Sequence, residues 1–161
     1  MAKLSQSEID ALVAKLQFYK YQVSYGDEII GPLDSPPKIE PDFETKDTML
    51  YETGEDPLAS IISKNNATVT LETNDVSKAL EMLQTYKKGD NILDTKFAKE
   101  LRFEPITDDA TARAIVFPRA FLNPGLSTNF AEGAEPNFVS LGFTAKENDE
   151  GVLYNLEPIG A

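Results

Sequence analysis

The residues of this chain that could perform chemistry are almost all carboxylates. Of its 161 residues 27 are Asp or Glu, whereas His and Cys are both absent. A pair of carboxylates can hydrolyse a glycosidic bond, but 27 candidates leave the choice of a pair unconstrained. Without His there is no imidazole base and no Ser-His-Asp triad, and without Cys there is no thiolate nucleophile, disulfide or zinc-thiolate site. We therefore expect a protein that is not an enzyme and needs no cofactor or metal.

Short motifs add no further chemistry. The sequence lacks the GxxxxGK phosphate loop, the GxGxxG dinucleotide loop and the GxSxG nucleophile elbow. The acidic stretch 147–151 lacks the DxDxDG spacing of a calcium loop, so a solvated turn is the favoured interpretation. The row Tyr19, Tyr21 and Tyr25 could stack on bases or sugars, but a strand face packed in the core beneath an N-terminal helix is favoured.

Charge is distributed unevenly along the chain. The net charge is −12, which should repel nucleic-acid phosphates. Between Asp27 and Asp56 ten acidic residues stand against two lysines. The one basic concentration, called here the basic patch, consists of Lys87, Lys88, Lys96, Lys99 and Arg102. Because complementary charges steer association, we hypothesise that the basic patch of one copy docks on the acidic segment of another.

The elements that must position these charges begin with a helix. Ser5 and Glu8 have the spacing of a capping box, which predicts an N-terminal helix over about 6–17 with an apolar stripe from Ile9 to Leu16. The pattern then alternates with a period of two through Tyr25, which predicts a strand. Gly26-Asp27 predicts a hairpin turn into a partner strand over 28–33.

Residues 34–57 interrupt this regularity. They contain four prolines and few apolar side chains, and proline cannot donate a hydrogen bond to a strand ladder. The composition predicts a long loop, an arm or an edge hairpin rather than a central strand. We expect its acidic residues to lie exposed on an arm between subunits. The candidates are Glu40, Asp42, Glu44 and Asp47.

The rest of the chain is predicted to hold one strong helix among short strands. A strand ending at Thr73 leads to Asn74 as the cap of a helix over about 75–88, with Lys87 and Lys88 in its last turn. Further strands are expected within 92–107, 112–122, 138–146 and 152–156, the last two as a C-terminal hairpin. The fold class is therefore mostly β (α+β), a β-sandwich or barrel, as one domain over 1–161 with an acidic arm or loop at about 34–57.

Three stretches together resemble the major tail tube proteins of long-tailed bacteriophages. The strand-to-helix stretch from Ala67 to Leu83 contains Thr-Leu-Glu-Thr-Asn-Asp. The stretch from Ala114 to Pro124 reads Ala-Ile-Val-Phe-Pro-Arg-Ala-Phe-Leu-Asn-Pro. Asn129-Phe130-Ala131-Glu132-Gly133 precedes a strand, an acidic turn and a final Gly-x-Leu-Tyr. Together these stretches cover roughly residues 65–158.

The resemblance implies a β-sandwich with a flanking helix that assembles as hexameric rings stacked into a hollow tube. Its implied partners are copies of itself, a tape measure protein, a tail terminator and a sheath. DNA would pass through without specific binding, and acidic residues facing the bore would repel its phosphates. The expected location is the virion tail after synthesis in the host cytoplasm, with no membrane segment. The alternative is a β-sandwich binding module, either a tail adaptor or a carbohydrate-binding domain that uses the tyrosine face.

Overall fold

A computed structural model describes residues 3–16, 20–48, 54, 59–130 and 136–159 of the chain. In chain order the elements are α1 (Gln6–Ala14), β1 (Lys20–Tyr25), β2 (Glu28–Ile30), β3 (Lys38–Thr48), β4 (Ala59–Thr73), α2 (Val76–Gln84), the 3₁₀ turn η2 (Thr95–Phe97), β5 (Lys99–Ile106), β6 (Arg113–Leu122), β7 (Ser127–Asn129), β8 (Phe138–Ala145) and β9 (Asn155–Pro158). The described strands form one nine-stranded sheet. The mostly β, α+β class predicted from the sequence is confirmed.

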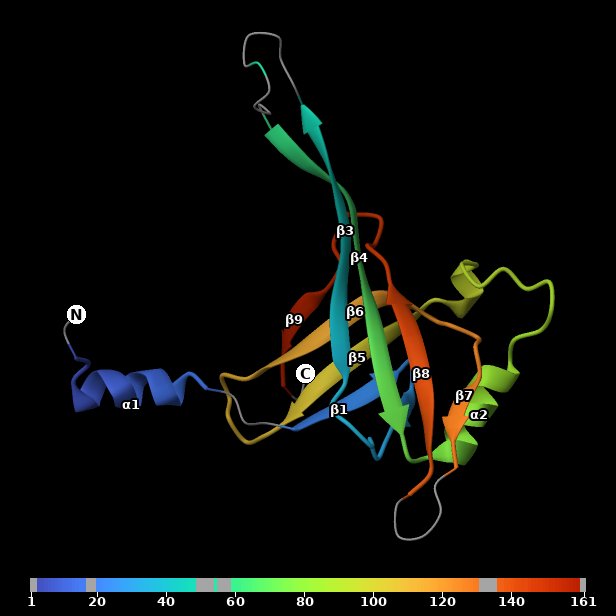
Figure 1. The fold of residues 1–161 in the computed structure, drawn as a ribbon, viewed down its shortest axis with the longest axis horizontal. Coiled ribbons are helices and arrows are strands. Elements are labelled where there is room, and N and C mark those ends of the chain that lie inside the picture. Colours follow the sequence, from blue (N-terminus) through green and yellow to red (C-terminus); the bar gives the residue numbers. More distant parts are fainter. Residues whose placement is uncertain (1–2, 17–19, 49–53, 55–58, 131–135, 160–161) are drawn as a thin grey trace.

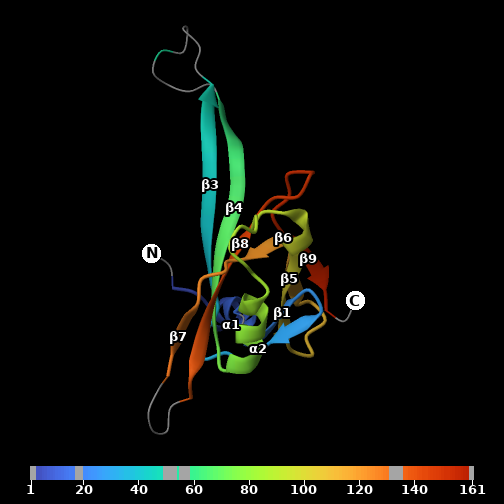
Figure 2. The same cartoon turned by 90° about the vertical axis from the view of Figure 1, so that its right-hand side faces the viewer.

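The sheet folds over on itself at β6. Its order is β2-β1-β5-β6-β8-β4-β3, with β7 added to β8 and β9 added to β6. The first part of β6 pairs with β9 and its last residues pair with β8, while β5 pairs along its other edge. As a result β3, β4 and β8 stand across β1, β5 and β6, as Figures 1 and 2 show. This gives the two facing layers of a sandwich from a single sheet.

The core lies between these layers. The ring centroids of Tyr25 on β1 and Phe143 on β8 are 4.9 Å apart, so the two layers touch directly. On β8 every second residue from Val139 to Ala145 is fully buried, because alternate residues of a strand point to the same face of the sheet. Helix α2 covers one end of this core with Ala79, Met82 and Leu83.

The tyrosine row does not lie beneath the N-terminal helix. Tyr25 is buried in the core and Tyr21 is half-buried, while Tyr19 lies outside the described residues. No residue of α1 is buried, and α1 extends away from the sheet in Figure 1. The prediction that the row packs beneath the N-terminal helix is therefore wrong. Tyr25 instead packs against Phe143 of β8, and it lines a small pocket together with Met82 of α2.

Both predicted helices form with shifted ends. The capping box of α1 is confirmed, since the Glu8 amide donates to Ser5 Oγ at 3.3 Å and the Ser5 amide donates to Glu8 Oε2 at 2.7 Å. Helix α2 is capped by Asp75 and not by Asn74. The side-chain amide of Asn74 instead donates to Asp34 Oδ1 at 3.0 Å and to the Asn137 carbonyl at 2.9 Å. These two bonds fix Asn74 to neighbouring loops, so the helix starts one residue later.

The end of α2 also differs from the prediction. The helix ends at Gln84 with Thr85 as its C-cap, so Lys87 and Lys88 lie beyond its last turn. The Thr85 hydroxyl donates to the Met82 carbonyl at 2.9 Å. The Tyr86 ring packs 4.9 Å from the Phe97 ring. These contacts direct the chain away from the helix axis before the lysines are reached.

The expected C-terminal hairpin is wrong. Strand β9 pairs with β6, for example Leu156 with Ile115, and not with β8. The turn at 147–151 forms as expected, with Asn148 Oδ1 accepting from the amides of Glu150 and Val152, both at 3.0 Å. After this turn the Tyr154 ring packs 6.1 Å from Phe117 on β6, which draws the chain to that strand. The short strand β7 was not predicted.

Substituting Gly26 tests the β1–β2 turn. Gly26 has φ +62° and a Cβ there would lie 3.1 Å from the Lys99 side chain. We expect Gly26→Ala to lower the free energy of unfolding by about 1 kcal/mol, because alanine is strained at positive φ. Urea denaturation measures this, and Gly31→Ala, where a Cβ meets nothing within 4 Å, is the matched control. An unchanged midpoint for Gly26→Ala would contradict the turn geometry.

The buried Tyr25 hydroxyl predicts a loss of stability at alkaline pH. It lies 2.9 Å from the Phe97 carbonyl oxygen and 3.0 Å from that of Ala120, and burial raises the pKa of Tyr25 to about 12. A raised pKa means that the folded chain keeps this proton longer than the unfolded chain does. The stabilisation is therefore complete below about pH 10 and is lost as the pH rises to about 12.

The measurement compares Tyr25→Phe with the original chain in urea unfolding from pH 8 to pH 12. The substitution removes both the hydrogen bonds and the titrating group. The difference in unfolding free energy between the two proteins should therefore shrink as the pH rises above 10. A difference that stays constant over this range would contradict the assignment.

Candidate functional site

Neither a metal-binding cluster nor a membrane-spanning helix is found among the described residues. Among them there is no group of three or more Asp or Glu side chains close enough to hold a metal ion. No helix within the described ranges is long and apolar enough to cross a membrane. The most prominent exposed surface belongs to the hairpin of β3 and β4.

Strand β3 is the outer strand of the sheet, and all 11 of its residues are exposed. The upper parts of β3 and β4 rise beyond the other strands in Figures 1 and 2. The sequence left a loop, an arm or an edge hairpin open for residues 34–57. The described residues 38–48 form one strand of an edge hairpin. Pro41 is tolerated because β3 has a partner strand on one side alone.

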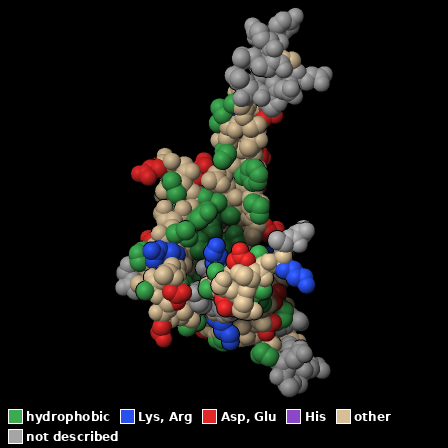
Figure 3. Space-filling model, turned by 90° about the vertical axis from the view of Figure 1, so that its left-hand side faces the viewer, with side chains coloured by type: hydrophobic (Ala, Val, Ile, Leu, Met, Phe, Trp, Pro, Cys, Tyr) green, Lys and Arg blue, Asp and Glu red, His purple; other side chains and the backbone are tan. Residues whose placement is uncertain are grey.

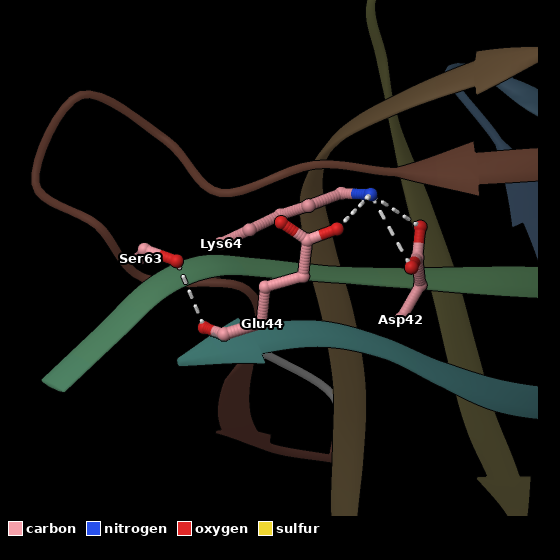
Figure 4. A network of polar contacts seen from close by, with 4 residues as sticks. All are labelled: Asp42, Glu44, Ser63 and Lys64. Carbon is pink, nitrogen blue, oxygen red and sulfur yellow. Dashed lines mark hydrogen bonds and ion pairs between the residues drawn. The ribbon is translucent and has the colours of Figure 1, made fainter. Parts of the chain in front are cut away.

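One face of the hairpin carries the predicted acidic residues. Lys38 Nζ lies 2.7 Å from Glu40, and this hydrogen bond raises the pKa of the Lys38 ammonium. Lys64 Nζ on β4 lies 3.1 Å from Asp42 and 4.0 Å from Glu44, as Figure 4 shows. The Ser63 hydroxyl donates to the Glu44 carbonyl at 3.2 Å. These acids are exposed but partly neutralised within the hairpin.

The fourth predicted acid lies further up the hairpin. Asp47 accepts a short hydrogen bond from the Ser60 hydroxyl. Between Asp47 and Asp42 the register shifts at Glu44/Thr45, so Ser63 is an extra residue on β4. A bulge of this kind bends and twists a ribbon, and it occurs where the hairpin leaves the body.

The opposite face of the hairpin is apolar. In the register Ile39 pairs with Val69, Pro41 with Ala67 and Phe43 with Asn65, and paired residues share a face. Val69 and Ala67 are buried in the core, but Ile39 is 42% and Phe43 60% exposed. The face that enters the core at the base of the hairpin thus continues into solvent. This apolar face was not predicted, although Ile39, Pro41 and Phe43 alternate with the acidic residues at a period of two.

This apolar face forms one wall of a groove of about 520 Å³, called here the hairpin groove. Its other wall comes from β6, β9 and the segment between β8 and β9. The lining residues used below are Ile39, Phe43, Ile115, Tyr154 and Leu156. In Figure 3 hydrophobic side chains gather in the hollow at the base of the hairpin and continue along it.

In the structure the four lysines of the basic patch differ from Arg102 in their exposure. Lys87, Lys88, Lys96 and Lys99 are all exposed, on the loop after α2, on η2 and at the start of β5. Lys96 Nζ lies 4.9 Å from the Phe97 ring centroid and Lys99 Nζ lies 5.6 Å from that of Tyr25. This loop lies beside the body in Figure 1, away from the raised end of the hairpin.

Arg102 differs from the four lysines. Its side chain is 16% exposed and lies 2.5 Å from Glu157, 3.6 Å from Glu104 and 4.0 Å from Glu100. The hydrogen bond with Glu157 raises the pKa of the Arg102 guanidinium. The ion pair of Arg102 with Glu157 therefore links β5 to β9, and the acidic neighbours of Arg102 balance its charge. The four lysines remain as the exposed part of the basic patch.

No protein-family model matches the chain, and no curated protein matches it in sequence. Solved structures do share its fold. One is a chain of the PVC sheath–tube complex of an extracellular contractile injection system in the extended state, with 15% identity and a TM-score of 0.63 over 98% of this chain and 100% of that chain. Another is the anti-feeding prophage cap, a tube terminating cap, with 14% identity and a TM-score of 0.61 over 89% and 91%.

A third similar structure is a chain of the PVC sheath/tube terminator in the extended state. It has 14% identity and a TM-score of 0.60 over 88% of this chain and 96% of that chain. At these identities the likeness is one of fold. It covers between 88% and 98% of this chain and agrees with the fold that the resemblance to tail tube proteins implies.

Proposed function

We propose that this chain is a structural subunit of a tail tube, in a phage tail or a related contractile injection machine. Copies assemble as hexameric rings, and the rings stack into a hollow tube that serves as a conduit, for DNA ejection in a phage. The main support for this proposal is the fold that 98% of this chain shares with a chain of the PVC sheath–tube complex.

The exposed surfaces support an assembling subunit. The apolar face of the hairpin and the hairpin groove leave Phe43, Tyr154 and Leu156 between 51% and 60% exposed. Contiguous apolar surface of this kind marks a contact with another protein. A repeating assembly supplies that contact from copies of the same chain. A closed ring needs two different complementary surfaces on each subunit. The proposed partners beyond other copies are a sheath, a tape measure protein and a tail terminator in the virion tail.

A tube terminator is the second candidate function. Two of the similar structures are a tube terminating cap and a sheath/tube terminator. A terminator forms a ring that closes a tube and does not stack on itself without limit. The two functions therefore differ in one measurable property, the length of the assembly that the purified protein forms.

Negative-stain electron microscopy of the purified chain, over a range of concentrations, separates these functions. A tube subunit gives hollow tubes or stacks of rings, whereas a terminator gives single rings. A chain that stays monomeric at the highest concentration, by analytical ultracentrifugation, contradicts both.

The charge hypothesis gives a prediction about assembly. Reversing Lys96 and Lys99 to Glu should raise the concentration needed for assembly by about twofold to thirtyfold at low salt, because each surface ion pair contributes about 0.2–1 kcal/mol. The effect should fade as salt is added. Sedimentation at 50 and 500 mM NaCl measures this, with Lys20→Glu, an exposed lysine on β1, as the matched control. Unchanged assembly at both salt concentrations would contradict docking of the four lysines on the acidic face of the hairpin.

A further inference from the structure

Helix α1 presents an apolar side that no described part of the chain covers. Ile9, Leu12, Val13 and Leu16 follow at helical spacing and are between 40% and 57% exposed. Leu4 before the helix is 55% exposed. An isolated helix of nine residues is marginal in water, and an amphipathic helix normally gains its stability by packing its apolar side on another surface. This side, called here the α1 stripe, therefore requires a surface to pack on.

The hairpin groove is a surface of matching character. It is concave, and Ile39, Phe43, Tyr154 and Leu156 line it while remaining 42% to 60% exposed. The charged pairs of the hairpin belong to the opposite face, where Lys38 and Lys64 are engaged with Glu40 and Asp42. An apolar helix side in the groove would therefore meet few charges. Recognition of an amphipathic helix by an apolar groove is a recurring mode of binding.

We propose that the α1 stripe of one copy docks in the hairpin groove of a second copy of this chain. The inference rests on the proposed function, because it requires copies that assemble. It adds which two surfaces meet. It also gives a heterologous contact, since helix and groove are different parts of the chain, and such a contact repeats through a ring or a stack.

The area available agrees with one contact among several. The five apolar side chains in and flanking α1 and four of the groove are each about half-exposed, and each can bury about 75–100 Å². Docking would thus bury about 700–900 Å² in total, whereas a stable isolated complex needs about 1,200–2,000 Å². Two copies are therefore not expected to form a tight dimer through this contact alone. Repeated in an assembly with other contacts, it holds neighbouring subunits together.

Disulfide trapping tests the contact cleanly because the 161 residues contain no cysteine. One protein carries Leu12→Cys and the other carries Tyr154→Cys together with a size tag. The two are mixed under assembly conditions and oxidised. On a non-reducing gel we expect a covalent heterodimer in at least tenfold greater yield than with Ala11→Cys. Ala11 is exposed and lies on the side of α1 opposite the stripe, so it is the matched control.

Two results of the trapping experiment would overturn the docking of α1 in the groove of another copy. Equal heterodimer yields from Leu12→Cys and Ala11→Cys overturn the proposal. A second result also overturns the proposal. If a chain with both Leu12→Cys and Tyr154→Cys forms the disulfide within one molecule, and the mixture gives no heterodimer, then α1 occupies the groove of its own chain.

Electron microscopy of the same samples separates this proposal from the proposed function. Tubes or rings without the heterodimer overturn the docking of α1 and leave the tube function intact. The heterodimer without rings or tubes supports the docking and overturns the tube function.

Discussion

Replacing Phe143 with alanine should lower the free energy of unfolding by about 3–5 kcal/mol. The Phe143 side chain is fully buried, and its ring lies 4.9 Å from that of Tyr25 on the facing layer. In the sheet Phe143 pairs with Val69 on one side and with Leu122 on the other. Truncation would therefore open a cavity where three strands and the facing layer meet. Urea unfolding at a concentration where the chain is monomeric measures the loss.

The matched control is Leu126→Ala, because Leu126 is 64% exposed and its truncation should change the free energy of unfolding by less than about 0.5 kcal/mol. The total stability of a domain is about 5–15 kcal/mol. Phe143→Ala should accordingly remove a large part of the stability and move the urea midpoint to a clearly lower concentration. A loss below 1 kcal/mol would contradict close packing of the two layers at this ring.

Local sequence patterns were sufficient to predict individual strands and helix ends. A strand was predicted within 138–146, and in β8 every second residue from Val139 to Ala145 is buried. The capping box predicted the start of α1 because Ser5 and Glu8 interact locally. In both cases the information lies within a few neighbouring residues, which is what a sequence pattern can report.

Pairing between distant segments was not predictable in this way. The sequence predicted β9 as the partner of β8 because the two are adjacent in the chain. In the structure β9 joins β6, where Tyr154 packs on Phe117 and Arg102 binds Glu157. These contacts join residues 37 and 55 positions apart in the sequence and leave no local pattern.

The candidate site was predicted in part. The acidic residues from Glu40 to Asp47 lie exposed on the hairpin, as expected, and whether they contact another subunit stays a prediction. The hairpin groove could not be predicted, because its walls come from residues near 40, 115 and 155. The edge strand itself was obscured by its prolines and acids, although its apolar residues alternate.

A second large effect, on assembly, is expected from truncating Phe43, the exposed aromatic residue of the hairpin. We expect Phe43→Ala to raise the concentration needed for assembly by about 30-fold. An aromatic side chain at the centre of an interface contributes about 2 kcal/mol or more, and the assembly repeats the contact at every subunit. The free energy of unfolding of the monomer should change by less than about 0.5 kcal/mol, because Phe43 is 60% exposed. Sedimentation and urea unfolding measure the two quantities separately.

Ile106→Ala provides the matched comparison, since Ile106 on β5 is 63% exposed and lies outside the hairpin and its groove. A general loss of surface hydrophobicity would weaken assembly in both variants, whereas a specific contact at the hairpin weakens it in Phe43→Ala alone. Assembly that is unchanged in Phe43→Ala would mean that the apolar face of the hairpin makes no subunit contact. The edge strand would then expose Ile39 and Phe43 to solvent even in the assembled state. That arrangement leaves apolar surface uncovered on an unpaired strand edge, which natural sheets generally avoid because it promotes aggregation.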